Sequence, residues 1–203
     1  MGIRDFFKSM KEGGQALKGE PVKDKVFSSE HEYTDNKTAV TEFKRSKDKL
    51  FNVDKWSGMH GLTSTFELYG EHGNQLPDAK VKEDHFIRIV MPGPSPENWV
   101  RVIELRDHKD VAYFVVSPSE DPTDKHNGKI EHFFVKEATS TFKVELKGKR
   151  IFAYEIGKNE GVNLGEYAGK RDIINILLSS GGWAGFQRIQ WKNLTNYLVH
   201  LNE

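Results

Sequence analysis

Apolar and polar positions alternate through the middle of the chain. Between residues 62 and 69, Phe66 and Leu68 alternate with Glu67 and Tyr69, the period of two that is typical of a strand with one buried face. The pattern recurs as far as Ile156 and predicts seven strands, over residues 62–69, 86–91, 99–105, 111–116, 131–135, 139–146 and 150–156. Most of their connections are shorter than the roughly dozen residues that a parallel crossover needs, so we expect a largely antiparallel sheet.

A helix is predicted before these strands. The apolar residues Val40, Phe43, Leu50 and Phe51 recur at near-helical spacing with lysines between them, which is typical of a helix with one buried side. The residues that can cap it are Asp35, Asn36 and Thr38. We expect this helix over residues 38–53, followed by a glycine-containing turn in which Trp56 closes the core.

Residues 172–201 form an apolar helical segment after the last strand. Residues 173–178 are apolar on almost every side, which favours burial on more than one side, and residues 179–182 interrupt the helix. A second helix resumes near Phe186 and carries one apolar face, suited to packing across a sheet. The predicted fold class is therefore α+β, a curved antiparallel sheet of about seven strands packed against C-terminal helices.

The first part of the chain is predicted to lie apart from this domain. Ile3, Phe6, Phe7 and Met10 are spaced as one stripe of a short helix, which must be buried on the domain, in a homo-oligomer or on a partner protein. The composition then turns polar, which indicates an exposed linker or an edge strand around Val26 and Phe27. We therefore divide the chain into residues 1–36, an N-terminal helix and linker, and residues 37–203, a single α+β domain.

The amino-acid composition argues against several classes of function. Thirty Lys and Arg residues balance thirty Asp and Glu residues, so no net field attracts nucleic acid. The chain has no cysteine, which excludes disulfides and thiolate metal sites and suits the reducing cytoplasm. It has no signal-peptide pattern and no run near the roughly 18 apolar residues of a membrane span. We expect a cytoplasmic protein without a membrane span.

No spacing of residues matches a known catalytic or metal-binding motif. The chain lacks the nucleophile elbow, the phosphate-binding glycine loops and the zinc-protease motif. Its eight histidines are scattered rather than spaced as ligands, and we expect neither a metal nor a cofactor. An enzyme using His132 or Glu160 as a base remains a hypothesis, which requires a perturbed imidazole or carboxyl in a cleft.

Two groups of polar residues allow either a structural or a binding role. Asn159, Glu160 and Asn163 follow the last strand; their side chains either fold back on the turn or hydrogen-bond a ligand at the mouth of a cavity. Charged residues such as Arg88 and Glu155 interrupt apolar strands. They face water if the sheet is half exposed, but must be paired if it curls around a cavity, because an unpaired buried charge costs several kcal/mol.

The order of helix, Trp56, antiparallel strands and C-terminal helical segment resembles the START-like (helix-grip) superfamily, most over residues 45–89 and 172–201. The resemblance implies a curved sheet around a long final helix with an apolar cavity between them. The leading hypothesis is non-enzymatic binding of a small apolar or amphipathic molecule there. The candidate ligand-binding residues are Trp56, Trp99, His132, Asn159, Glu160, Asn163, Trp183 and Trp191. The alternative is a scaffold protein that joins a larger assembly through its N-terminal helix and a sheet edge.

Overall fold

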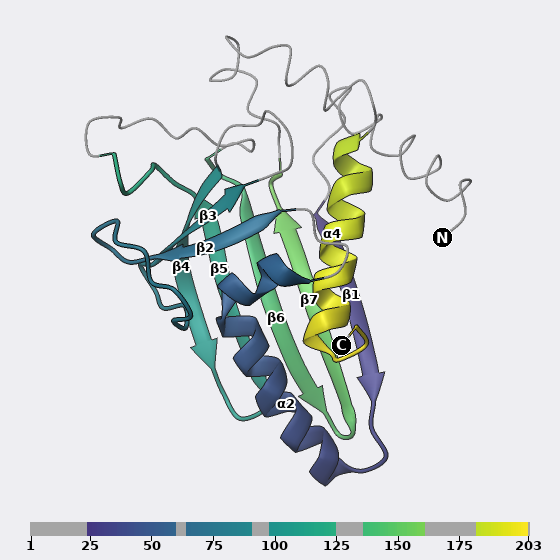
Figure 1. Ribbon diagram of the computed structural model, residues 1–203. Helices are drawn as coiled ribbons and strands as arrows, with labels where there is room; N and C mark the ends of the chain where they lie inside the picture. Colours follow the sequence, from purple (N-terminus) through teal and green to yellow (C-terminus); the bar gives the residue numbers. More distant parts are fainter. Residues whose placement is uncertain (1–23, 60–63, 91–97, 125–135, 161–181, 203) are drawn as a thin grey trace.

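The computed structural model describes residues 24–59, 64–90, 98–124, 136–160 and 182–202. The elements are β1 (Lys25–Glu32), α2 (Asn36–Phe51), the 3-10 helix η1 (Val53–Gly58), β2 (Thr65–Tyr69), β3 (Phe86–Val90), β4 (Asn98–Asp107), β5 (Val111–Pro118), β6 (Thr139–Lys147), β7 (Arg150–Lys158) and α4 (Gly182–Leu198). The strands form one antiparallel sheet in the order β1-β7-β6-β5-β4-β3-β2 (Figure 1). The predicted α+β fold class is confirmed.

Helix α2 begins at a residue that the sequence marks as a cap. The Asp35 side chain accepts a hydrogen bond from the backbone N–H of Thr38 over 2.9 Å, which satisfies one of the free donors of the first turn. The buried side of α2 carries Ala39, Phe43, Ser46, Leu50 and Phe51. Val40 is 44% exposed, contrary to the predicted stripe, because it stands one helical step away from Ala39.

Strand β1 corrects the predicted division of the chain. It pairs with β7 along its whole length, from Lys25 opposite Gly157 to Glu32 opposite Arg150, so the sheet already includes residues placed in the N-terminal linker. Of the two readings left open for Val26 and Phe27, the edge strand is the correct one. Apolar alternation could not indicate β1, because three of its four residues on the covered face are polar: Lys25, Ser29 and His31.

The other six strands, β2 to β7, all coincide with predicted strands. The predicted strand at residues 131–135 lies outside the described residues, as do residues 173–178, which were predicted to be helical, and the predicted N-terminal stripe of Ile3, Phe6, Phe7 and Met10. The role of that stripe as a contact with a partner or a second copy stays a prediction.

Helix α4 bridges the two edges of the sheet. Its Thr195 hydroxyl lies 2.8 Å from the Ser29 hydroxyl on β1, and its Gln190 accepts a 2.7 Å hydrogen bond from Ser64, which immediately precedes β2. Since β1 and β2 are the first and last strands in the sheet order, one helix can reach both only because the sheet curls towards it (Figure 1). The described fold is thus a curled antiparallel sheet that wraps around a C-terminal helix, with β1 as its first strand.

Both long helices lie on the same face of the sheet, which we call the inner face (Figure 1). The core there contains Trp56, whose ring centroid lies 5.1 Å from that of Phe142 and whose indole N–H donates to the carbonyl of Lys49. At the end of α4, His200 lies 3.0 Å from the Ser46 hydroxyl and 2.7 Å from the Lys49 ammonium of α2. The two helices are therefore joined to each other as well as to the sheet.

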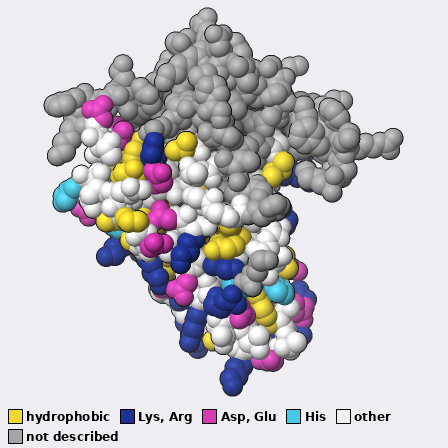
Figure 2. Space-filling view, in the orientation of Figure 1, with side chains coloured by type: hydrophobic (Ala, Val, Ile, Leu, Met, Phe, Trp, Pro, Cys, Tyr) yellow, Lys and Arg dark blue, Asp and Glu magenta, His cyan; other side chains and the backbone are white. Residues whose placement is uncertain are grey.

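The surface mixes both signs of charge. In Figure 2, Lys and Arg side chains lie among Asp and Glu side chains over the described part of the face that is turned to the viewer. Within the described segments, no helix combines the length and the apolar character needed to cross a membrane.

Candidate functional site

A row of aromatic side chains crosses the inner face of the sheet and is interrupted by one carboxyl group. In register, Phe27 of β1 lies opposite Glu155 of β7, Glu155 lies opposite Phe142 of β6, and Phe142 lies opposite Phe114 of β5. Paired residues of neighbouring strands point to the same face, so Glu155 lies between two phenylalanines. The same face of β7 also carries Ile151 and Ala153, both buried.

The Glu155 side chain is fully buried, with 0% exposure. Among the described residues, neither of its carboxyl oxygens has a hydrogen-bond partner. Burial, and secondly the nearby charge of Glu160, raise the pKa of Glu155 well above the ordinary value of a glutamate. The Ser140 hydroxyl opposes this shift but does not reach either oxygen with hydrogen-bond geometry. Burial therefore disfavours the ionised form of Glu155, in a place where no described residue uses its polar atoms.

A second carboxyl group, that of Glu160, lies over the next inner-face position of β7, Gly157. Lys25 lies opposite Gly157, and Gly157 lies opposite Ser140. Since Gly157 has no side chain, the carboxyl group of Glu160 folds back into the space above it, where a Cβ atom on residue 157 would collide with it. The loop after β7 thereby places Glu160 on the inner face, 8% exposed.

Glu160 is compensated, in contrast to Glu155. Its Oε2 lies 3.6 Å from the Lys25 ammonium and accepts a 3.2 Å hydrogen bond from the amide of Gln187 on α4. The Gln187 oxygen in turn accepts a 2.9 Å hydrogen bond from Lys25. Burial raises the pKa of Glu160, while Lys25 and Gln187 oppose the shift. The three side chains form a closed triangle at the contact between β1, β7 and α4.

Helix α4 contributes a second unpartnered polar atom. Trp191 lies one turn after Gln187, and its ring lies 5.4 Å from that of Phe142 and 6.4 Å from that of Phe66. The residue is 8% exposed, and its indole N–H has no acceptor among the described residues. Phe142 thus contacts Trp191 of α4 with its ring and lies opposite Glu155 in the sheet. We call Lys25, Glu155, Glu160, Gln187 and Trp191 the Glu155 cluster.

The Glu155 cluster offers a small molecule three unused polar positions beside an aromatic surface. Two are the acceptor oxygens of Glu155, one of which becomes a donor when the carboxyl is protonated, and the third is the indole donor of Trp191. Buried polar groups in proteins are nearly always hydrogen-bonded, so two such residues next to the same phenylalanine require an explanation. Among the described residues, no group of three His, Asp or Glu side chains is arranged to hold a metal ion.

The structure brings only some of the predicted site residues together. Trp56, Glu160 and Trp191 all lie on the inner face, Trp56 as part of the core beneath α2 and η1. Asn159 is exposed at a positive φ of 53°, and its side chain approaches the carbonyl of Glu137, which lies before β6, at 3.5 Å. His132 and Asn163 lie outside the described residues; Trp183 falls in the first turn of α4, but its side chain is outside what the structure describes.

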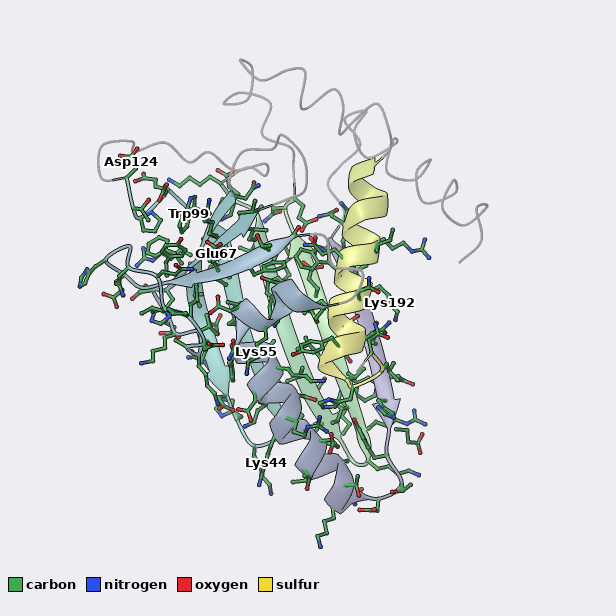
Figure 3. All side chains as sticks on the ribbon, viewed as in Figure 1. Lys44, Lys55, Glu67, Trp99, Asp124 and Lys192 are labelled. Atoms are coloured by element: carbon green, nitrogen blue, oxygen red, sulfur yellow. The ribbon has the colours of Figure 1, made fainter. Side chains whose placement is uncertain are left out.

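Trp99 was placed in the wrong part of the fold. Its neighbours Val100 and Val102 belong to the core, and Trp99 itself points to the outer face, where its ring meets that of Tyr69 at 4.8 Å. Figure 3 shows Trp99 near Glu67, at the end of the sheet formed by β2, β3 and β4 and away from α4. It cannot line a space between the sheet and α4, because the sheet lies in between.

Lys25 and Gln187 were not predicted as site residues, and Glu155 was noted only as a charge within a strand. The sequence did contain a signal for Glu155. Every second residue from 151 to 157 belongs to one face of the strand, and the other three on that face, Ile151, Ala153 and Gly157, are apolar or small. A glutamate on such a face is unusual. Nothing comparable marks Lys25 or Gln187, which meet only through the pairing of β1 with β7 and the docking of α4.

No protein-family model matches the sequence, and no curated protein matches it significantly. Among solved structures, a hypothetical protein, jhp0584 of Helicobacter pylori, is 14% identical with a TM-score of 0.43, over 90% of this chain and 92% of that one. Ara h 8.0201 is 11% identical with a TM-score of 0.39, over 88% and 99%. Truncated norcoclaurine synthase from Thalictrum flavum is 15% identical with a TM-score of 0.38, over 89% and 98%. The likeness does not extend beyond overall layout.

Proposed function

We propose that this protein binds a small apolar or amphipathic molecule without converting it, between the inner face of the sheet and α4. The observation that supports the proposal most is Glu155, a fully buried carboxyl group whose two oxygens have no partner in the described structure. Leaving a buried polar group unsatisfied costs about 1–3 kcal/mol. A ligand that pairs with Glu155 recovers that free energy in the bound state.

The surroundings of Glu155 fit an amphipathic ligand. Phe27, Phe142 and Trp191 provide apolar surface around the carboxyl group, while Glu160, Lys25 and Gln187 supply a polar end. A small-molecule site typically combines a mostly apolar lining with a few polar groups that fix orientation. The apolar body would lie on the aromatic side and the polar head group at the Glu155 cluster.

A second candidate function is that of a scaffold protein. One observation favours it: among the described strands β1 lies at an edge of the sheet, and its Val26 is 58% exposed. An unpaired strand edge can accept a strand from a partner. This role does not involve Glu155, so the two candidates respond differently to a substitution there.

The test compares co-purified small molecules in three versions of the full chain by native mass spectrometry, followed by organic extraction. The natural chain and Glu30→Gln are expected to carry a stoichiometric adduct, because Glu30 is exposed and points to the outer face of β1. Glu155→Gln is expected to lose the adduct while folding at least as stably. An adduct that survives Glu155→Gln unchanged would argue against this site, and adduct-free protein that binds none of the probes described below would favour the scaffold.

A further inference from the structure

Resting on the proposed function, we propose that the head group of the ligand is a cationic amine, which binds to Glu155 beside the Lys25–Glu160 pair. The proposal concerns the chemical class of the ligand. It follows from the balance of charges, the supply of hydrogen-bond donors and the aromatic surroundings in the Glu155 cluster.

The charges in the cluster do not balance when both carboxyl groups are ionised. Lys25 on β1 faces Glu160, and both also bond to Gln187, so one ammonium and one carboxylate neutralise each other. The described residues opposite Glu155 in the sheet are neutral, Phe27 on β1 and Phe142 on β6, and so is the nearby Ser140. Gln187 and Trp191 on α4, which contact Glu160 and Phe142, are neutral as well. Lys25 also lowers the pKa of Glu155, but its charge is shared with Glu160. Among the described residues, an ionised Glu155 therefore leaves one negative charge for a cation from outside to balance.

The number of hydrogen-bond donors that Glu155 can accept also favours an amine. Within the described part of the chain, both Glu155 oxygens are acceptors without a donor. An ammonium group has up to three N–H donors and can reach both oxygens, whereas an alcohol has one. Hydrogen bonds between charged partners are about twice as strong as neutral ones.

Aromatic rings next to Glu155 favour a cation further. Phe27 and Phe142 flank the carboxyl group in the sheet, and the Trp191 ring lies against Phe142. A cation within about 6 Å of an aromatic ring face is attracted by the negative potential of the ring. A carboxylate head group would instead meet two acidic residues, and the one ammonium nearby already has partners.

The test uses head-group series with constant bodies: octylammonium, octanol and octanoate, and 1-naphthylmethylammonium, 1-naphthalenemethanol and 1-naphthoate. Affinities for the full chain are measured by native mass spectrometry and by quenching of tryptophan fluorescence. We expect the amine of at least one series to bind about tenfold or more tightly than its carboxylate, which corresponds to one charge-assisted hydrogen bond in a buried site. Glu155→Gln should remove most of this preference and leave alcohol binding nearly unchanged.

A second variant separates the two possible anchors. Lys25→Met should retain amine binding, because Lys25 does not bond to the amine and its loss frees a further carboxylate. If the carboxylate binds most tightly and Lys25→Met abolishes its binding, Lys25 is the anchor and the amine assignment is wrong. Equal binding of the three head groups in both series also overturns it, while the proposed binding function stands. Binding of no compound to the natural chain rejects both proposals.

Discussion

The carboxyl group of Glu160 occupies the space that a side chain on Gly157 would need. A Cβ atom built on Gly157 would collide with the Glu160 carboxyl carbon and with both of its oxygens. The φ angle of Gly157 is not in the left-handed region, so the requirement for glycine here is one of space and not of backbone conformation. The position of Glu160 beside Lys25 and Gln187 therefore depends on the absence of a side chain at residue 157, three positions earlier in the chain.

Gly157→Ala is expected to push Glu160 out of the triangle with Lys25 and Gln187. Loss of these charge-assisted contacts should lower the free energy of unfolding by about 1–2 kcal/mol. The measurement is urea unfolding of the full chain. Gly58→Ala is the matched control, because no atom lies within 4 Å of a Cβ at that position, and its free energy of unfolding should change little.

A double-mutant cycle tests whether the effect acts through Glu160. In a Glu160→Ala background the space above Gly157 is empty, so Gly157→Ala should cost much less there than in the natural chain. Equal costs in the two backgrounds would show that the added methyl group collides with something else.

Glu155→Gln is expected to stabilise the protein increasingly as the pH rises. The raised pKa means that folded Glu155 keeps its proton to a higher pH than unfolded Glu155, whose pKa is about 4.3. Above that pH the unfolded state gains free energy by ionising, so the natural chain loses stability by about 1.4 kcal/mol per pH unit until the folded group also ionises. Glutamine has no such loss.

The measurement is the difference in free energy of unfolding between Glu155→Gln and the natural chain, from about pH 4 to pH 8. It should be near zero at the lower limit and grow with pH. Glu30→Gln, an exposed substitution on the outer face of the same sheet, should show no such growth. A difference that is constant with pH would mean that Glu155 has the same pKa in the folded and the unfolded protein, so that burial does not raise it.

The sequence predicted the strands and helices better than it predicted the residues that form the Glu155 cluster. The strands β2 to β7 were found because period-two alternation is a direct consequence of one buried face, as in Phe66 and Leu68. β1 could not be found in this way, since α4 docks on it through hydroxyl groups and a lysine instead of apolar side chains, with Ser29 at the centre. Trp99 was misplaced because apolar and charged residues are mixed in both alternating sets of residues 99–105, so the sequence does not show to which face the ring points.

The Glu155 cluster could not be assembled from sequence for a related reason. Lys25 and Gln187 stand 162 positions apart, and only the pairing of β1 with β7 and the path of α4 bring them together. Glu160 was the exception, since a carboxylate in a turn directly after a strand is visible as a candidate without knowledge of the fold. Its partners became visible only in three dimensions.

Ser29→Ala is expected to loosen the docking of α4 on β1. The Ser29 hydroxyl is buried and lies 2.8 Å from the Thr195 hydroxyl, 2.6 Å from the Asn196 side-chain oxygen and 3.0 Å from the Lys192 ammonium. Lys192 lies on α4 beside β1 (Figure 3). Because several polar groups lose one partner together, we expect a loss of about 1–3 kcal/mol in the free energy of unfolding. Ser28→Ala, exposed on the other face of β1, should change it by less than about 0.5 kcal/mol.

Hydrogen exchange extends this test to the ligand site. If Ser29 holds α4 in place, Ser29→Ala should accelerate exchange of α4 amides more than that of β5 and β6 amides. Uniform acceleration over all elements would indicate global destabilisation without a specific role in docking.

Removal of the N-terminal residues separates the role of β1 from that of the apolar stripe. A chain that starts at Asp24 lacks Ile3, Phe6, Phe7 and Met10 but keeps all of β1, whereas a chain that starts at Asp35 also loses the strand that pairs with β7 and carries Lys25. We expect the first chain to fold and to retain the adduct. The second should aggregate or unfold at a lower temperature, because the loss exposes the edge of β7 and one side of α4.

Solution mass, measured by light scattering, then decides what the stripe does. If the full chain is a homo-oligomer and the chain from Asp24 is a monomer of undiminished thermal stability, the stripe is the contact between copies. If both are monomers and the shorter chain unfolds at a lower temperature, the stripe packs on its own domain. If both chains are monomers of equal stability, the stripe is expected to bind a partner protein. That partner would bind the full chain and not the chain from Asp24. Such binding would support the scaffold function alongside ligand binding.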